Sequence, residues 1–228
     1  MINKKLIALV PVRKGSQRVK NKNIKSFGDT SLLQLKIDIL KQVKNLDEII
    51  INSDCADMLN IAKKNGVSTY KRDEYYGRSI INNSDFFEHI AQNTEENSII
   101  MYSPVTCPFI KVSTYEDAIS KFRDFENYNS LTSAFEVNHH MWREGKPINY
   151  DPYKTPNSQD LPEILGMSYG ISIVERELMI KRKNVVGDKP YFYKLSEIES
   201  VDIDTPVEFD FAEFIYNNKL KNTDFLNK

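Results

Sequence analysis

Continuous apolar runs alternate with amphipathic segments along most of the chain. The first run, residues 5–12, has the uninterrupted apolar character of a strand that is buried on both faces. Further strands are predicted at residues 48–52, 67–71, 98–102, 131–137, 169–174, 191–194 and 200–204. Apolar residues at helical spacing predict helices at residues 31–44, 54–64, 84–92, 112–125 and 206–218, with a short helix after residue 174.

Local signals mark where several of these helices begin and end. Thr30 or Ser31 is the expected N-cap of the first helix, and Asp54 is the expected N-cap of the second, which stops at residues 65–66. Pro206 lies in the first turn of the last helix, where proline is favoured.

The strand–helix alternation predicts an α/β fold with a doubly wound, mostly parallel, Rossmann-like sheet. Ligands of such sheets bind at the C-terminal ends of the strands, so the loops after Val12, Asn52 and Tyr102 are expected to carry a site. The alternation is interrupted only at residues 138–166, which contain four prolines and predict an irregular arm.

Composition adds bounds to this picture. The chain has 228 residues, of which 40% are hydrophobic, enough for one domain over residues 1–228 with its own core. The net charge of −1 makes a nucleic-acid polymer an unexpected partner. No apolar run approaches the roughly 20 residues of a membrane span, so we expect a cytoplasmic protein without membrane insertion. Cys55 and Cys107 lack metal-ligand spacing and are expected to be reduced thiols.

The loop after the first strand is strongly basic. Residues 13–25 hold six cations and no acid: Arg13, Lys14, Arg18, Lys20, Lys22 and Lys25. The small pair Gly15 and Ser16 lets the backbone approach an anion. These features indicate a polyphosphate cradle, although not with P-loop spacing. The alternative interpretation is a solvated basic loop.

Residues 197–213 show the opposite charge, with seven acids and no cation. Asp202 and Asp204 flank Ile203 on a predicted strand, so both carboxylates should point to one face. Two like charges on one face favour a cation between them, and Mg²⁺ prefers carboxylate and phosphate oxygens. Alternatively, Asp204 caps the helix that begins at Pro206, and the other acids form a solvated helix face.

The basic loop carries a family resemblance. Residues 9–23 read Leu-Val-Pro-Val-Arg-Lys-Gly-Ser-Gln-Arg-Val-Lys-Asn-Lys-Asn, which resembles the N-terminal signature of the CMP-sialic acid synthetase (acylneuraminate cytidylyltransferase) family. The resemblance implies that Arg13 and Lys22 contact the triphosphate of CTP and that Asn23 holds the nucleotide, with Gly15 and Ser16 in the same loop. Gln17 is a departure, because the family usually has Lys there, and the neighbouring Arg18 is a possible substitute.

Other segments extend the resemblance over nearly the whole chain. Asp-Ile-Asp-Thr at residues 202–205 matches the family's metal motif, which implies Asp202 and Asp204 as Mg²⁺ ligands. Arg72 and Ser84 correspond to residues that line the family's cytidine pocket, although Ser84 is equally plausible as a helix N-cap.

The segments on the acceptor side depart from the family pattern. Residues 103–110 stand where the family has Gln-Pro-Thr-Ser-Pro-Leu-Arg, and both the Gln and the Arg are absent. Ser103, Thr106, Gln159 and Tyr169 are the residues that the resemblance places on the sugar-acid side, with Tyr169 replacing an Asn. Because a polar pocket rejects substrates that leave its groups unpaired, these changes suggest a changed acceptor.

Taken together, the resemblance implies a nucleotide-diphospho-sugar transferase type of fold and a homodimer joined through the arm at residues 138–166. It implies transfer of CMP from CTP to the anomeric hydroxyl of a sialic-like nonulosonic acid, with release of pyrophosphate, for cell-surface glycan synthesis. Arg13, Lys22, Asp202 and Asp204 would be the catalytic residues. The alternatives are another acceptor (ketodeoxyoctulosonate, a phosphorylated metabolite or a phosphonate) and an inactive nucleotide-binding homologue.

Overall fold

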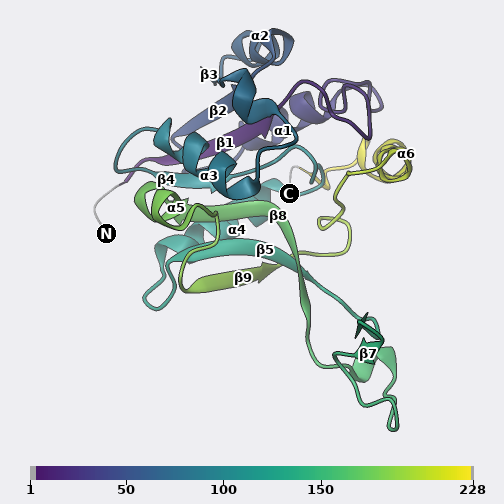
Figure 1. Ribbon diagram of the computed structural model, residues 1–228. Helices are drawn as coiled ribbons and strands as arrows, with labels where there is room; N and C mark the ends of the chain where they lie inside the picture. Colours follow the sequence, from purple (N-terminus) through teal and green to yellow (C-terminus); the bar gives the residue numbers. More distant parts are fainter. Residues whose placement is uncertain (1–3, 227–228) are drawn as a thin grey trace.

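A seven-stranded sheet forms the centre of the computed structural model, which describes residues 4–226 (Figure 1). The strand order is β3-β2-β1-β4-β8-β5-β9. The strands are β1 (Leu6–Val12), β2 (Glu48–Ser53), β3 (Ser68–Lys71), β4 (Ile99–Tyr102), β5 (Ser130–Glu136), β8 (Leu165–Glu175) and β9 (Pro190–Lys194). Strand β8 runs antiparallel to its neighbours β4 and β5, and the other pairs are parallel. The predicted α/β fold with a mostly parallel sheet is thereby confirmed.

Helices cover both faces of this sheet. One face carries α3 (Asn83–Gln92) and α5 (Arg176–Arg182), which pack on each other. The larger core cluster takes buried residues from α1 (Leu32–Leu40), α2 (Ala56–Lys64), α4 (Val112–Arg123) and α6 (Pro206–Ile215). Ala8 and Val10 of β1 join this larger cluster and Leu9 the other, as expected for a strand buried on both faces. Within residues 4–226, no helix is both long enough and apolar enough to cross a membrane.

The sequence suggested N-cap residues for helices α1, α2 and α3, and one of the three is correct while two are wrong. Ser31 caps α1, because its hydroxyl accepts a hydrogen bond from the Gln34 amide at 3.2 Å. Asp54 does not cap α2: Cys55 holds the N-cap position, and the Asp54 carboxylate accepts from the Lys14 amide instead. Ser84 does not cap α3 either, since Asn82 immediately precedes the helix in extended backbone and its side chain accepts from the Asp85 amide.

The predicted strand at residues 200–204 is wrong. Among residues 4–226, residues 201–204 have no regular secondary structure and belong to neither of the sheets. The Ile203 amide donates to the Thr106 carbonyl at 2.9 Å, and the Ile203 side chain is fully buried. The Ile203 backbone bond therefore attaches this segment to the loop after β4. Helix α6 follows it, begins at Pro206 as predicted, and continues into a π-helical turn over Tyr216–Leu220.

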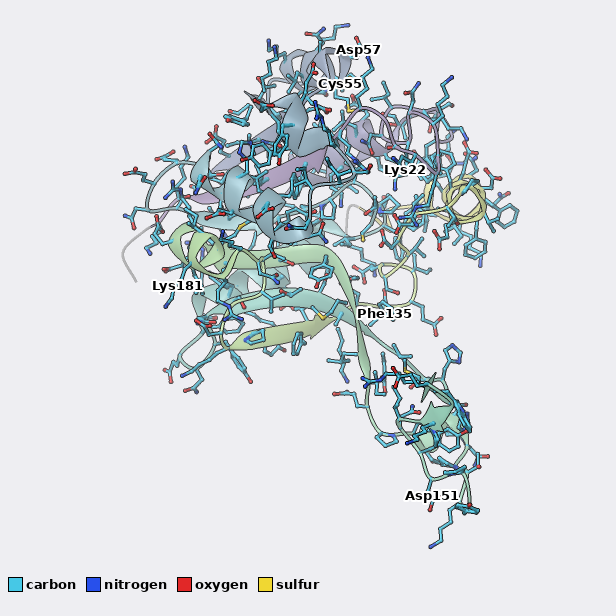
Figure 2. The ribbon with its side chains drawn as sticks, in the orientation of Figure 1. Lys22, Cys55, Asp57, Phe135, Asp151 and Lys181 are labelled. Carbon is cyan, nitrogen blue, oxygen red and sulfur yellow. The ribbon has the colours of Figure 1, made fainter. Side chains whose placement is uncertain are left out.

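The irregular stretch leaves the body as an arm between β5 and β8 (Figures 1 and 2). It holds a small hairpin of β6 (Trp142–Arg143) and β7 (Lys146–Pro147) and one turn of 3₁₀ helix, η2 (Ser158–Asp160). In Figure 2, Phe135 marks the junction with the body, and Asp151 lies near the far end. At the junction the Val137 amide donates to the Ile164 carbonyl at 2.8 Å, so the two connections are joined where they leave the sheet.

Candidate active site

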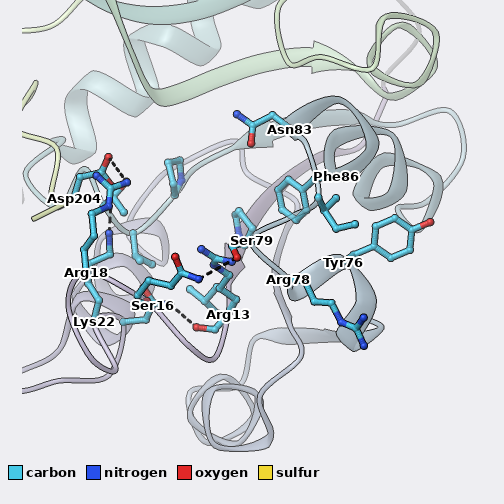
Figure 3. A pocket seen from close by; sticks show the side chains of 18 of the residues that line it. Arg13, Ser16, Arg18, Lys22, Tyr76, Arg78, Ser79, Asn83, Phe86 and Asp204 are labelled. Carbon is cyan, nitrogen blue, oxygen red and sulfur yellow. Dashed lines mark hydrogen bonds and ion pairs between the residues drawn. The ribbon is translucent and has the colours of Figure 1, made fainter.

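A pocket of about 490 Å³ lies at the C-terminal ends of β1 and β4 (Figure 3). Its walls come from the basic loop after β1, the segment from Arg72 to Phe86, the start of the loop after β4, and Asp204 just before α6. This is the edge of the sheet where the topology predicted a ligand. Its volume is in the range of small-ligand sites.

Three local contacts shape the basic loop. The Asp54 carboxylate, at the end of β2, accepts from the Lys14 amide at 3.0 Å. The Asn23 side chain donates to the Arg13 carbonyl at 3.2 Å, and the Arg13 guanidinium donates to the Gly77 carbonyl at 2.9 Å. Gly15 supplies a turn with φ of +79°, a region that glycine favours.

Four of the predicted CTP-binding residues in this loop line the pocket: Arg13, Ser16, Lys22 and Asn23. Gly15 is not part of the lining found among residues 4–226, and its contribution is to the turn.

One end of the pocket joins the basic and acidic segments, as Figure 3 shows. The Asp204 carboxylate lies 3.6 Å from Lys22 Nζ and 3.4 Å from the Arg18 guanidinium. Lys22 is almost fully buried, and its Nζ also donates to the Ile203 carbonyl at 2.5 Å. Lys22 therefore has a fixed position beside Asp204, so positive and negative groups that are about 180 residues apart meet at one place.

Asp202 lies next to this ionic end but does not line the pocket in the described part of the chain. Its carboxylate is 3.8 Å from the buried Cys107 thiol. Partial desolvation there raises the pKa of Asp202, and the negative charge of Asp204 raises it further. The two carboxylates are thus close enough to repel each other, although they do not share a strand.

This pair fits a divalent cation with oxygen ligands. Within residues 4–226, no group of three or more His, Cys, Asp or Glu side chains is arranged to hold a metal. Mg²⁺ does not need such a cage, since it commonly takes one or two carboxylates and completes its shell with water and substrate phosphates. The repulsion at Asp202, which a cation would relieve, is consistent with that use.

The opposite end of the pocket is aromatic, and sequence reasoning found only part of it. Arg72, predicted for the cytidine pocket, is 2% exposed and donates to Asn52 Oδ1 and the Val12 carbonyl, both at 2.8 Å. Its guanidinium lies 5.2 Å from the centre of the Phe86 ring. Ser84 is exposed and lies outside the described lining.

The residues missed at this end are Tyr76, Arg78, Ser79, Asn83 and Phe86. They come from the 3₁₀ turn η1 (Glu74–Gly77), the residues after it, and the start of α3. Aromatic and basic residues directly after a strand were the available signal.

Only one residue predicted for the acceptor side is in the pocket, namely Thr106. Ser103 is fully buried and its hydroxyl lies 2.7 Å from the Tyr115 hydroxyl. Gln159 lies on the arm, and the partly exposed Tyr169 lies in β8, where its φ is +53°. The pocket therefore gathers fewer of the residues predicted for the acceptor than of those predicted for the nucleotide.

Comparison with known proteins shows the family. A family model described as cytidylyltransferase matches residues 7–227. The chain is 24% identical to an N-acylneuraminate cytidylyltransferase of Oncorhynchus mykiss over 91% of its own length and 49% of the relative's. It is 22% identical to the post-translational flagellin modification protein B of Campylobacter coli, covering 96% of this chain and 99% of the relative. The chain thus spans about half the length of the N-acylneuraminate cytidylyltransferase that it matches.

Solved structures show the same fold. The structure of CMP:2-keto-3-deoxy-manno-octonic acid synthetase complexed with CTP matches with a TM-score of 0.71 at 14% identity, covering 95% of this chain and all of the other. A 4-diphosphocytidyl-2C-methyl-D-erythritol synthase from Anaerococcus prevotii matches with a TM-score of 0.69 at 12% identity, covering 95% of this chain and 97% of the other.

Proposed function

From the premise that this chain belongs to the cytidylyltransferase family, we propose that it transfers CMP from CTP to the anomeric hydroxyl of a sialic-like nonulosonic acid, for cell-surface glycan synthesis. The observation that carries the proposal is the meeting of Lys22 and Arg18 with Asp204 at one end of a pocket after β1. The relatives named as N-acylneuraminate cytidylyltransferases favour a nonulosonic acid as the acceptor.

In the proposed reaction the acceptor oxygen bonds to the α-phosphorus of CTP while the bond from that phosphorus to the oxygen bridging to the β-phosphate breaks. Pyrophosphate leaves with that electron pair, and Arg13 and Lys22 offset the charge that develops on it. Asp202, which lies beside the ionic end of the pocket, is our candidate to take the proton of the hydroxyl. Orientation accounts for most of the catalysis, because phosphoryl transfer needs little covalent participation by the protein.

The nucleotide would lie along the pocket. Gly15 and Ser16 leave room for phosphate oxygens beside the backbone of the loop. Asn23 holds the loop through the Arg13 carbonyl, and the end of the pocket near Arg72 and Phe86 is suited to a pyrimidine ring.

We assign Mg²⁺ to Asp202 and Asp204. When bound, this ion would neutralise the α-phosphate and lower the pKa of the attacking hydroxyl. The position of Asp204 in the pocket lining supports this assignment, because the triphosphate of CTP would bring its oxygens to the same place.

We also propose a cytoplasmic homodimer joined through the arm. Three large apolar side chains on the arm are exposed: Trp142 by 55%, Ile148 by 54% and Tyr153 by 94%. Gln159 lies on the same arm, so a dimer would let it serve the partner's acceptor site. Both cysteines are free thiols, which suits a reducing compartment.

The test is an acceptor screen. Pyrophosphate release is measured with each of the four nucleoside triphosphates against a nonulosonic acid, ketodeoxyoctulosonate, a phosphorylated metabolite and a phosphonate. We expect turnover with CTP and the nonulosonic acid only. Turnover with another acceptor would correct the substrate, and tight CTP binding with no turnover on the whole panel would indicate an inactive nucleotide-binding homologue.

A further inference from the structure

A lysine is fully buried beneath the loop that follows β4. Lys36 lies in α1, is 0% exposed, and is not part of the pocket lining described above. Its Nζ donates to the Cys107 carbonyl at 2.9 Å and to the Tyr115 hydroxyl at 2.7 Å. Neither partner is an anion, so the ammonium is held by neutral acceptors alone among the described contacts. Such burial is unfavourable, and a simple core position would favour an apolar side chain.

The lysine is connected to the ionic end of the pocket by a short series of hydrogen bonds. Cys107, whose carbonyl Lys36 holds, follows Thr106, and Thr106 lines the pocket. The Thr106 carbonyl accepts from the Ile203 amide at 2.9 Å, and the Ile203 carbonyl accepts from Lys22 Nζ. Ile203 separates the two proposed Mg²⁺ ligands. The backbone of the acidic segment is therefore attached to the loop that Lys36 holds.

A second branch fixes the start of the same loop. The Tyr115 hydroxyl accepts from Lys36 and lies 2.7 Å from the Ser103 hydroxyl. An ammonium group can only donate, so the Tyr115 oxygen accepts from a protonated Lys36, and the Tyr115 proton is left free to be donated to Ser103. Lys36 thus reaches both ends of the five-residue stretch 103–107.

We propose that Lys36 is a positioning residue for the nucleotidyl transfer: its ammonium group holds the loop at residues 103–107 and, through the Thr106–Ile203 bond, the segment that carries Asp202 and Asp204. The inference rests on the proposed function. It assigns a role in catalysis to a residue that touches neither substrate nor metal.

The position makes the role dependent on protonation. Burial lowers the pKa of Lys36 to about 8. The titratable groups that face Nζ are the Cys107 thiol from the loop and the Tyr115 phenol from α4, with Glu199 behind Tyr115. Burial raises the pKa of Cys107 to about 12 and raises that of Tyr115 as well, so neither group ionises near pH 8. Above that pH a neutral amine would hold the carbonyl more weakly and could accept from Tyr115, which releases Ser103.

The experiment compares Lys36→Met, an unbranched apolar replacement, with Ile37→Val, a core truncation at the next residue of α1. We expect Lys36→Met to fold, to keep KM for CTP within about threefold, and to lower kcat by roughly tenfold to 100-fold, the cost of a misplaced catalytic group. Wild type and Ile37→Val should lose activity as the pH rises through 8, and Lys36→Met should lack this decline. A decline at the same pH in Lys36→Met would overturn the proposal, whatever its kcat.

A second variant covers the case in which Lys36→Met does not fold. Tyr115→Phe removes one of the two acceptors of the ammonium, so it should move the alkaline decline to lower pH. A decline that does not move would also overturn the proposal.

An independent readout separates this inference from the proposed function. Hydrogen–deuterium exchange of the Ile203 amide at pH 7 should be faster in Lys36→Met than in wild type and Ile37→Val, because its acceptor loop is released. Equal exchange would overturn the positioning role even if the wild-type chain released no pyrophosphate. A wild-type chain without turnover on the acceptor panel would refute the proposed reaction alone.

Discussion

Asp204 is partly exposed and forms ion pairs with two cationic side chains of the basic loop. Its exposure and these ion pairs determine what the loss of its charge should do. Its side chain is 49% exposed, so its ion pairs with Lys22 and Arg18 add little to stability. We expect Asp204→Asn to leave the unfolding temperature nearly unchanged and to reduce pyrophosphate release on the order of 100-fold, because it removes a ligand of the Mg²⁺ ion proposed to offset the phosphate charge. Steady-state turnover and thermal unfolding check this. Asp210→Asn makes the same charge change on the exposed side of α6 and should retain activity; equal turnover of the two variants would refute the role of Asp204.

Lys36 predicts an unusual dependence of stability on pH. Its pKa falls from 10.5 to about 8 on folding, so between these values the unfolded chain binds more protons than the folded one. The free energy of unfolding contributed by this residue therefore rises with pH across that interval, by up to about 3 kcal/mol. Urea unfolding of wild type and Lys36→Met from pH 7 to pH 10 measures it. The variant lacks the contribution, so its stability advantage over wild type should shrink as the pH rises, and a constant difference would contradict the shift.

At the scale of elements, the start of α6 holds the acidic segment in place. The Thr205 hydroxyl accepts from the Glu208 amide, and the Glu208 carboxylate accepts from the amides of Asp204 and Thr205 at 2.8 and 2.7 Å. We expect Thr205→Ala to cost about 1 kcal/mol of unfolding free energy. Because the same capping box holds the Asp204 backbone, turnover should also fall. Thr205→Ser keeps the hydroxyl and should restore both quantities, whereas full activity of Thr205→Ala would separate the cap from the site.

Elements set by local pattern were predictable from the sequence, and those set by distant partners were not. Apolar periodicity fixed β1 and most of α1 because strand and helix each impose their own spacing. The alternation at residues 202–204 predicted a strand, but the Ile203 amide donates to Thr106 in a loop, so the segment joins neither of the described sheets. The Asp54 carboxylate accepts from the Lys14 amide, which is 40 residues away in the sequence, so the local pattern around Asp54 could not show that it does not cap α2.

For the site too, the parts set by local sequence were predictable and the parts set by distant partners were not. The family resemblance and the charge runs identified the loop from Arg13 to Asn23 and the acidic pair. Tyr76 and Phe86 were missed because only the folded chain brings η1 and α3 to the pocket. Lys36 occupies a polar position in an amphipathic pattern, and its burial depends on partners 71 and 79 residues away.

At the scale of the whole molecule, the net charge of −1 is a cancellation between distant segments. The basic residues 13–25 and the acidic residues 197–213 lie at opposite ends of the chain and meet at Asp204. Two further contacts extend their junction: the Glu213 carboxylate accepts from the Gly28 amide at 2.8 Å, and Lys25 lies over the Phe209 ring at 4.1 Å. The near-zero total therefore conceals two segments of opposite charge that meet at one site.

The arm is separable from the body, which makes its role in assembly testable. Among the described residues, the apolar core contains none from 138–163, and Val137 already pairs with Ile164 where the arm leaves the sheet. Replacing residues 138–163 by Asn-Gly, a dipeptide suited to a tight hairpin, should leave the unfolding temperature and the Kd for CTP nearly unchanged.

Light scattering should show the intact chain at twice 26.5 kDa and the shortened variant as a monomer, because the exposed Trp142, Ile148 and Tyr153 are removed. Turnover should be lost with the arm, since Gln159 would no longer reach a partner's site. A full-length chain that runs as a monomer, or a shortened variant that stays dimeric, would refute the arm as the dimer contact. A shortened monomer with full turnover would show instead that Thr106 and the rest of this chain's own pocket suffice for the acceptor.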